Sequence, residues 1–410
     1  MTIWTVNLYV LIAAIVLSFL LAQIRRPKNY AIELIKNFIG IYFIFSGIVK
    51  AIDPVGTAIK MEEYFDIFHE YFPFLNSIWD LLEPISLAVS VFMILVEILL
   101  GIFLILGALP LLTSSILLIT ILFFTFLTGF SHITGKVTDC GCFGDFLKLT
   151  PKVSFFKDIF LTILIIPLVV SWKKITPLFS AKPRGLSLLI LSILAIVFTL
   201  RNIYYEPIVD FRPYKPGVNI VQCLSLPPDA KPYIYENTFI YKNNTTGKNE
   251  EFKVDQLPTD MDQWTFVDRI DKLIQKGDDP LCKDFAINDK DGNDLTAIYM
   301  NEEKPLFVLV IPTLDKMSTK NITRVATIFK DAVKDGNKAI CLTGSNIDNV
   351  QKVLNLDDIH LDVFNTDETP LKTIMRSNPG ILILKKGTIL GKYHHNEEIS
   401  YEKIKKDLAL

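Results

Sequence analysis

The sequence lacks most of the motifs on which familiar enzyme chemistry depends. Its 410 residues contain no Gly-rich phosphate loop, no Ser-His-Asp arrangement and no zincin motif, and only five cysteines and five histidines. An excess of charge is missing as well, because the net charge is −2 and no dense Lys/Arg cluster occurs. We therefore expect neither a phosphate-loop nor a zinc-protease site, and we exclude nucleic acid as a partner.

Long apolar runs are what the sequence does have. Half of the residues are hydrophobic (50%), and the long runs all lie before about Arg201. Six of them approach the roughly 20 residues that cross a bilayer: 3–23, 33–51, 84–107, 112–132, 155–172 and 185–201. The first lacks a basic start and an Ala-x-Ala cleavage site, so we expect a retained helix. The predicted fold begins with an all-α polytopic membrane domain at 1–202.

Basic residues between the runs predict how the chain crosses the membrane. They follow the first run and separate the fifth from the sixth: Arg25, Arg26, Lys28, Lys173, Lys174, Lys182 and Arg184. The positive-inside rule puts these loops in the cytoplasm. Both termini, the 52–82 loop and everything after Arg201 then lie outside, which in a bacterium is the periplasm. We predict a multi-pass inner-membrane protein in contact with the lipid bilayer.

The most informative motif is Cys140-Gly-Cys142, inside Asp139-Cys-Gly-Cys-Phe-Gly-Asp145. It falls on the predicted outer face, where thiols are oxidised. A disulfide across so small a ring would be strained and easily reduced, which is more typical of catalytic or regulatory disulfides. We expect a redox pair, with a structural loop clip as the alternative. A soft-metal site that includes His132 ranks lower, since only two zinc ligands are assured.

Glu97 lies deep inside the third run, where a carboxyl group is energetically unfavourable and usually faces the bundle or a polar cavity. Two interpretations stay open. Glu97 is either a proton or ligand site, or a protonated side chain that is hydrogen-bonded to a neighbouring helix through Ser46 or Thr125.

Other polar residues lie near the ends of the runs. Lys50 and Asp53, at the exit of the second run, and His132, at the exit of the fourth, are expected to snorkel or to be solvated. Segment 61–72 places aromatic side chains on one helical face and acidic ones largely opposite. This pattern predicts a helix along the membrane surface, to which we assign no chemistry.

Several of these segments resemble one family of membrane proteins. The segments are Phe45-Ser-Gly-Ile-Val-Lys-Ala-Ile-Asp-Pro-Val-Gly56, Glu62-Glu-Tyr-Phe65, Asp139–Asp145 and Phe155–Lys157. Over about residues 33–172 they look like the DoxX/MauE family, which implies a four-helix core. The resemblance implies redox roles: MauE-type members in maturing disulfide-rich periplasmic enzymes, and DoxX-type members in quinone-linked oxidation of sulfur compounds. A quinone is thus the candidate cofactor. The most similar branch has six spans and a periplasmic extension, as in Bacteroidota.

Beyond Arg201 the sequence predicts two further segments. Residues 203–283 form a Pro-rich connector with short strands from 233 to 273, around a turn at 243–247. Residues 284–410 alternate strands with helices, which predicts a soluble α/β domain. A hairpin at 285–295 comes first, and the further elements are expected at 306–311, 319–334, 339–343, 347–355, 381–385 and 389–393.

The order of these elements, with Pro379 before the penultimate strand, resembles the thioredoxin-like fold of TlpA- and peroxiredoxin-type proteins. The resemblance implies that Pro379 is cis. The chain departs from that family where Cys-x-x-Cys should stand, because Pro312–Asn321 contains no cysteine. We therefore expect no dithiol exchange by this domain alone.

The remaining cysteines and histidines carry weaker expectations. Cys341 lies within a predicted strand and should be inert core. Cys223 and Cys282 are candidates for a disulfide, although sequence alone leaves the pairing open. His394-His395 is expected to be an exposed pair at a solvated strand end.

Two functions from different classes follow. In the first, which we prefer for the membrane domain, Cys140 and Cys142 exchange electrons with a periplasmic substrate, and Glu97 handles protons or a quinone. In the second, the protein is a non-enzymatic scaffold or accessory subunit of an envelope protein-biogenesis or secretion complex, whose 284–410 domain binds a periplasmic or envelope partner. Whether the protein is an enzyme stays open between them. A transporter ranks last, because it rests on Glu97 alone.

Overall fold

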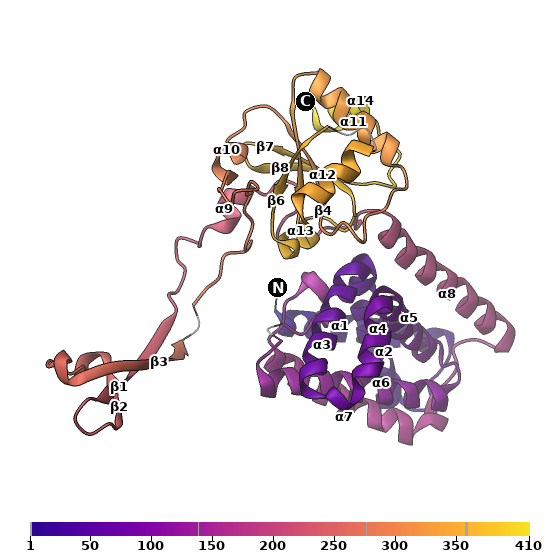
Figure 1. The fold of residues 1–410 in the computed structure, drawn as a ribbon. Helices are drawn as coiled ribbons and strands as arrows, with labels where there is room; N and C mark the ends of the chain where they lie inside the picture. Colours follow the sequence, from indigo (N-terminus) through magenta and orange to yellow (C-terminus); the bar gives the residue numbers. More distant parts are fainter. Residues whose placement is uncertain (1, 138, 276, 357–359) are drawn as a thin grey trace.

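The computed structural model describes residues 2–410 apart from 138, 276 and 357–359. Six stretches of helix in the described chain are long and apolar enough to cross a membrane, and they coincide closely with the predicted runs. The long helices are α1 Ile3–Ile24, α2 Tyr30–Ile52, α5 Ser86–Leu106, α6 Pro110–Thr134, α7 Pro151–Val170 and α8 Ala181–Tyr204. They form a bundle, next to which stands a C-terminal α/β region with a long arm (Figure 1).

Close packing of α2 against α5 organises the bundle. A Cβ atom on Gly40 would lie 2.5 Å from Ile105 Cγ1, and one on Gly101 would lie 2.6 Å from the Gly40 carbonyl oxygen. Small residues permit such an approach in membranes, where van der Waals contact drives helix association. Gly47 packs equally closely against Ile98, at 2.5 Å. The last turns of α2 are therefore held against the middle of α5.

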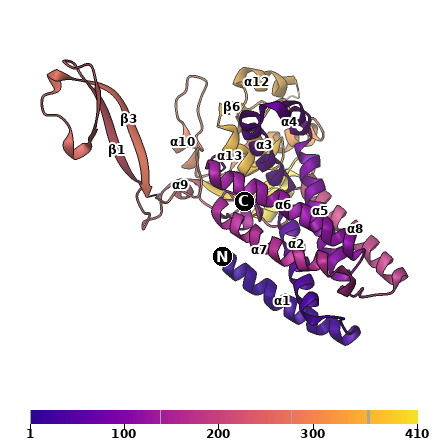
Figure 2. The same ribbon diagram turned by 90° about the horizontal axis from the view of Figure 1, so that it is seen from below.

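The two ends of the bundle gather different segments. At one end, Arg25 donates a hydrogen bond to the Pro177 carbonyl, and the Leu178 N–H donates to the Leu106 carbonyl (3.1 Å). At the other end lie α3 (Pro54–Tyr71), α4 (Asn76–Leu82), the loop between α6 and α7, and the C-terminal region (Figure 2). This grouping matches the predicted alternation of loops from one side of the membrane to the other.

Short 3-10 turns complete the membrane half and the arm. Their bounds are η1 Pro73–Leu75, η2 Glu83–Ile85, η3 Gly144–Phe146, η4 Trp172–Lys174, η5 Val254–Gln256 and η6 Met261–Gln263.

The C-terminal region is built on a five-stranded sheet in the order β6-β5-β4-β7-β8. Strands β4, β5 and β6 are parallel, whereas β7 and β8 are antiparallel to their neighbours. The strands are β4 Leu306–Ile311, β5 Lys338–Thr343, β6 Asp362–Asn365, β7 Gly380–Lys385 and β8 Thr388–His394. The helices are α9 Ile220–Leu224, α10 Thr296–Met300, α11 Ile322–Lys334, α12 Ile347–Leu356, α13 Glu368–Ile374 and α14 Tyr401–Leu408.

Alternate residues of the fully buried strand β4 enter two cores. Phe307, Leu309 and Ile311 pack with α11, α12 and α14, while the residues between them pack with α9, α10 and α13. The predicted α/β character is confirmed, whereas β6, α13 and α14 were not predicted. The Asn378–Pro379 bond is cis, as the resemblance implied.

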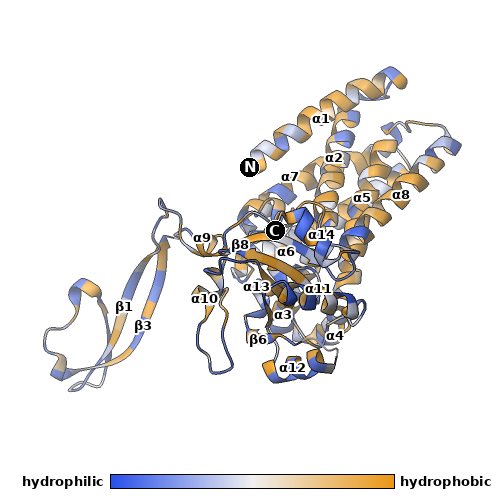
Figure 3. Ribbon diagram, turned by 90° about the horizontal axis from the view of Figure 1, so that it is seen from above, coloured by the Kyte–Doolittle hydropathy of each residue, from blue (hydrophilic) through white to orange (hydrophobic). Residues whose placement is uncertain are grey.

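The arm is a three-stranded antiparallel sheet in the order β2-β1-β3. Its strands are β1 Ile234–Asn243, β2 Asn249–Lys253 and β3 Trp264–Gln275. The sequence predicted short strands from 233 to 273; it located the first two and the turn between them, but gave no bounds for β3. The arm projects away from both the bundle and the α/β region (Figure 3).

A disulfide between Cys223 and Cys282 ties the two ends of the arm to the α/β region. Both cysteines are buried in the core that also contains Leu306 and Ile389. The Cys282 N–H also donates to the Cys223 carbonyl (3.0 Å). The pairing that sequence left open is thus made at the base of the arm.

Candidate functional site

Cys140 and Cys142 lie in the loop between α6 and α7, and both are free thiols. The Cys140 N–H donates to the Leu149 carbonyl (3.2 Å), which fixes the start of the loop to its end. Gly141 has φ of +65°, a conformation that glycine adopts without a steric penalty. A Cβ atom here would lie 3.0 Å from Lys60 Cγ of α3. The backbone conformation therefore favours glycine between the cysteines, and a side chain here would also displace Lys60.

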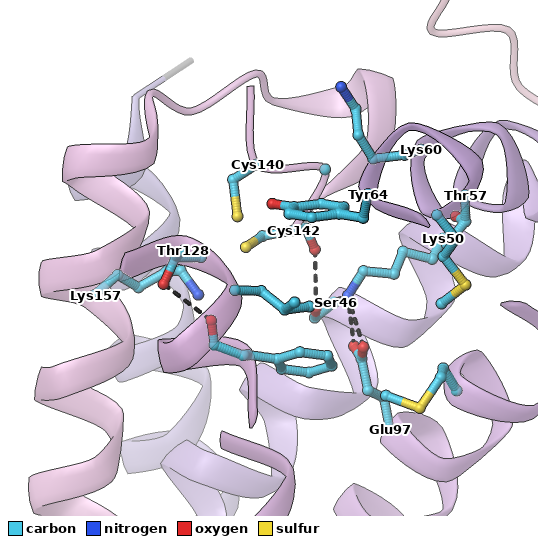
Figure 4. Close-up of a pocket in the computed structure, with 15 residues that line it drawn as sticks. Ser46, Lys50, Thr57, Lys60, Tyr64, Glu97, Thr128, Cys140, Cys142 and Lys157 are labelled. Atoms are coloured by element: carbon cyan, nitrogen blue, oxygen red, sulfur yellow. Dashed lines mark hydrogen bonds and ion pairs between the residues drawn. The ribbon is translucent and has the colours of Figure 1, made fainter. Parts of the chain in front are cut away.

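Both cysteines line a cavity of about 100 Å³ among α2, α3, α5, α6 and α7. Glu97 lines the same cavity, so the three residues singled out from the sequence come together. Its polar lining consists of Ser46, Lys50, Thr57, Lys60, Tyr64, Glu97, Thr128, Cys140, Cys142 and Lys157 (Figure 4). Its apolar lining consists of Met61, Met93, Phe124 and Leu127.

Glu97 and Lys50 form an ion pair inside the bundle. The Lys50 ammonium lies 2.7 and 2.8 Å from the two carboxylate oxygens, and the residues are only 8% and 1% exposed. Lys50 also donates to the Ser46 hydroxyl (2.9 Å), which donates to the Cys142 carbonyl oxygen (3.1 Å). A hydrogen-bonded chain thus leads from the intramembrane carboxylate to the cysteine loop (Figure 4).

This pair corrects two predictions. Lys50 neither snorkels nor is solvated, because the contact of Gly47 with α5 turns the end of α2 inward. Glu97 is bonded directly to Lys50 rather than to Ser46 or Thr125, and the Thr125 hydroxyl donates to its own helix. A buried charge is tolerated when an opposite charge lies beside it.

A second buried ion pair joins Lys157 to Asp158 on α7. Asp158 accepts a hydrogen bond from the Thr128 hydroxyl (3.0 Å). The Lys157 ammonium lies 6.0 Å from the centre of the Tyr42 ring and 5.9 Å from that of Phe143. This pair places a cation in the cavity wall near the thiols.

The sequence analysis missed the role of Lys157, which it used only as part of a family resemblance. The available signal was an adjacent Lys-Asp pair at the start of an apolar run. Charges at such a position are rare and usually face the bundle interior.

The two thiols differ in acidity. The pKa of Cys140 is lowered to about 7, chiefly because the Cys142 thiol donates a hydrogen bond to it. The Lys157 charge and the Ser154 hydroxyl add to this effect, while burial opposes it. The pKa of Cys142 is raised, because its proton is held by Cys140 and because it is buried. Cys140 is therefore the first thiol to ionise.

Helix α3 covers the site from the side of the C-terminal region. Lys60 forms ion pairs with Glu63 (2.5 Å) and with Asp139, the neighbour of Cys140. The Tyr64 hydroxyl is hydrogen-bonded to Ser131 on α6 (2.9 Å). We predicted a surface helix here. The helix is present, and its aromatic face packs against α6, where Phe68 contacts aromatic rings of that helix; its position along the membrane surface stays a prediction.

The C-terminal region rests on the bundle beside this helix. Arg376 pairs with Asp53, which is therefore not the solvated residue that the sequence suggested. A second cavity of about 380 Å³ lies between α3 and the loops at 312–316 and 375–378. The segment that lacks Cys-x-x-Cys thus faces the membrane domain.

The other candidates lie away from the cavity. His394 and His395 are only 4% and 8% exposed, so the prediction of an exposed pair is wrong: His395 Nδ1 lies 2.8 Å from the Ser377 hydroxyl in the domain interior. Cys341 is fully buried in β5. His132 is exposed, and no group of three or more His, Cys, Asp or Glu in the described residues is arranged to hold a metal.

Comparison with known proteins bears on the bundle and on the arm. Residues 235–276, a range that covers nearly all of strands β1 to β3, match a domain of unknown function, DUF8463. No curated protein and no solved structure matches the chain. Residues 28–171 match the family described as methylamine utilisation protein MauE, and this range includes every residue that lines the cavity. The protein therefore contains a MauE-like membrane domain, and that domain holds the whole of the candidate site.

Proposed function

We propose that the MauE-like domain is a thiol–disulfide oxidoreductase of the bacterial inner membrane, with its cavity and both termini on the periplasmic side. The observation that carries the proposal is the shared cavity of Cys140, Cys142 and Glu97. The match of residues 28–171 to the methylamine utilisation protein MauE supports a redox role that assists another protein. The substrate is a protein with a cysteine pair, for which Cys140–Cys142 serves as electron acceptor.

In the proposed reaction, the site begins as the Cys140–Cys142 disulfide. A substrate thiolate attacks the sulfur of Cys142, and Cys140 leaves as a thiolate. The low pKa of Cys140 favours this direction, since the more acidic thiol leaves faster. A second substrate thiolate attacks the mixed disulfide, which forms the substrate disulfide and releases Cys142. The substrate loses two electrons and two protons, and the pair gains them.

Regenerating the disulfide requires a two-electron acceptor. A lipid quinone, when bound, supplies this chemistry by accepting two electrons and two protons. The lining supports a quinone head group as occupant, because Phe124 and Leu127 form an apolar wall, while the ammonium groups of Lys60 and Lys157 keep N–H donors for a carbonyl oxygen beside their ion pairs. Glu97 contacts Lys50 and can exchange a proton with it.

The test is thiol trapping in intact cells. Alkylation of Cys140 and Cys142 is read as a mass shift before and after a short reductant pulse, with and without quinone depletion. We expect a mixed population that reoxidises only when quinone is present. Replacing both residues by Ser should abolish turnover without changing the melting temperature. A pair that stays fully oxidised in every condition would show a structural clip and refute the proposal.

A second candidate is the accessory-subunit role, which the docked C-terminal region favours. Its 312–316 loop, without cysteine, lines the cavity against α3. In this role the domain would bind a partner beside the site. Purification of the full chain and of a chain that lacks 284–410 tests this role. A stoichiometric partner lost with the deletion supports it, and a protein that purifies alone in both forms counts against it.

A further inference from the structure

The arm leaves one long strand edge open. β3 pairs with β1 on one side, and within the part of the chain that the structure describes no strand lies on its other side. Every residue from Thr265 to Gln275 is exposed. The arm projects clear of the rest of the molecule, so its own chain does not cover this edge (Figure 1). An open edge of this length is a template for pairing with another chain.

The charged side chains of β3 are arranged so that the strand complements itself. A second copy can be placed antiparallel with Ile270 opposite Ile270. Asp268 then faces Lys272 of the second copy, and Arg269 faces its Asp271. Because the arrangement is two-fold, each pair occurs twice. Opposite charges directly across an antiparallel ladder stabilise it.

The apolar side chains agree with the same register. Phe266 and Val267 lie at one end of the charged segment and Leu273 and Ile274 at the other, beside β-bulges at Val267 and Ile274, so the two-fold arrangement brings apolar residues together on both sides of the axis. All four are exposed in the single chain, by 46 to 56%. Pairing would remove part of this surface from water.

Neighbouring registers lack this complementarity. With Arg269 on the axis, Arg269 faces its own copy, and Asp268 faces Ile270. With Asp271 on the axis, like charges again meet, and Arg269 faces Leu273. Like charges directly opposite each other destabilise a sheet. The sequence of β3 therefore selects the register centred on Ile270.

The outer backbone edge of β3 is not used by β1. The Arg269 N–H donates to the Asp268 carboxylate of its own strand (2.8 Å), and pairing with a second copy would exchange this bond for one to a backbone carbonyl. The Arg269 side chain already lies 2.6 Å from Asp271 of its own strand. Residues opposite each other in an antiparallel pair lie on the same face of the sheet. Arg269 and Asp271 of the two copies would therefore form one group of four alternating charges.

We propose that two copies of this chain associate through β3, in the antiparallel register centred on Ile270, so that two three-stranded sheets become one six-stranded sheet. The contact is isologous, as expected for a two-fold dimer. It is independent of the chemistry at Cys140 and Cys142.

Charge-reversal variants of the full-length protein test the register. Dimerisation is measured by light scattering, which gives the mass of the protein in its detergent complex. Arg269→Asp sets Asp against Asp, and Asp271→Arg sets Arg against Arg, so each variant should weaken dimerisation at least about tenfold. Their cross-strand neighbours in β1, Phe239 and Asn237, are uncharged, so the arm itself is little affected. Mixing the two variants should restore a heterodimer, because every facing pair is again opposite in charge.

Two controls complete the test. Glu250→Arg, on the opposite edge strand β2, should leave dimerisation unchanged. Oxidation of an Ile270→Cys variant should give a disulfide-linked dimer rapidly, whereas in Val267→Cys the two thiols lie about 20 Å apart. The proposal is overturned if the unmodified protein is monomeric at all concentrations, if the charge-reversed variants dimerise normally, or if both cysteine variants cross-link alike.

Discussion

The guanidinium group of Arg376 and the carboxylate of Asp53 form a bidentate ion pair between the C-terminal region and the bundle. Nε lies 2.9 Å from Oδ1, and Nη2 lies 2.8 Å from Oδ2. Asp53 also caps α3, because its side chain accepts a hydrogen bond from the Gly56 N–H (2.9 Å). Burial alone would raise the pKa of Asp53, but Arg376 outweighs it and holds the pKa below its ordinary value. One carboxylate therefore connects the end of α2, the start of α3 and the C-terminal region.

Asp53→Asn should loosen this contact. The change leaves the Arg376 guanidinium, whose side chain is 6% exposed, with only the more distant Asp145 carboxylate (3.8 Å), and the local free energy of opening should fall by up to about 3 kcal/mol. Hydrogen exchange of segment 372–378 measures the loss. Glu303→Gln is the matched control, since its ion pair with Lys386 is highly exposed and should contribute little. Equal protection in both variants would contradict the prediction.

The same contact should depend on pH in one direction. Because the folded pKa of Asp53 is depressed, its stabilising effect is complete above the unfolded pKa of about 3.9 and disappears as pH falls through the folded value. Protection of segment 372–378 should therefore be constant from neutral pH down to about 4 and decrease below it. A decrease centred near pH 6 would point to another group.

The reactivity of Cys140 in the reduced protein should be half-maximal near pH 7, well below the value for an ordinary thiol. Lys157→Met should move the midpoint upward, because the cation that favours the thiolate is removed. Alkylation rates read by peptide mass spectrometry over pH 5 to 10 provide the measurement. Cys341 is an internal control: burial raises its pKa, so it should stay unreactive while the protein is folded. A midpoint for Cys140 above 8.5 would be incompatible with this prediction.

Glu97→Gln should be severely destabilising, by about 3 to 5 kcal/mol, because it leaves the Lys50 ammonium unpaired inside the bundle. Adding Lys50→Met should recover most of the loss, since both charges are then gone. Unfolding of the three proteins in mixed micelles measures this effect. If the double variant folds but its Cys140–Cys142 pair is no longer reduced and reoxidised, the Lys50–Glu97 ion pair also contributes to the reaction. A stable single variant would contradict the buried-pair interpretation.

Gly141→Ala should disturb the site more than Gly135→Ala does. Both glycines have φ near +65°, so both variants should lose about 1–2 kcal/mol from the backbone alone. Only at position 141 does the added methyl group meet Lys60, whereas nothing lies within 4 Å at position 135. The alkylation rate of Cys140 should therefore change only in Gly141→Ala. Equal rates would show that Lys60 adjusts freely.

The sequence was sufficient for the six membrane helices, because length and hydropathy alone decide whether a segment can span a bilayer. It also brought Cys140, Cys142 and Glu97 to attention, since each is unusual at its position. It could not predict that Lys50 turns inward. That depends on how α2 is rotated against α5, which is set by the packing of Gly47 on Ile98. Which buried charges form ion pairs depends on how the helices pack, and the sequence alone does not give this packing.

The soluble half shows the same limit at other residues. Strand β4 was predicted well because it is apolar and buried along its whole length. The bounds of strand β3, inside the stretch predicted to form short strands, could not be predicted, because charges at 268, 269, 271 and 272 interrupt the alternation that marks a half-buried strand. His394 and His395 seemed exposed because their burial depends on the Ser377 loop, which is distant in sequence.

The end of α2 is bound at two points, by the last membrane helix and by the C-terminal region. Asn202, at the end of α8, donates to the Ala51 carbonyl (3.0 Å), and Arg376 binds Asp53. Lys50 lies within one turn of both attachment points on the same rigid helix, a separation of about 5 Å along the axis. A mechanical load applied to the C-terminal region would therefore reach the cavity through this last turn of α2. A pulling force on the C-terminal region should therefore shift the Lys50 ammonium relative to the Glu97 carboxylate.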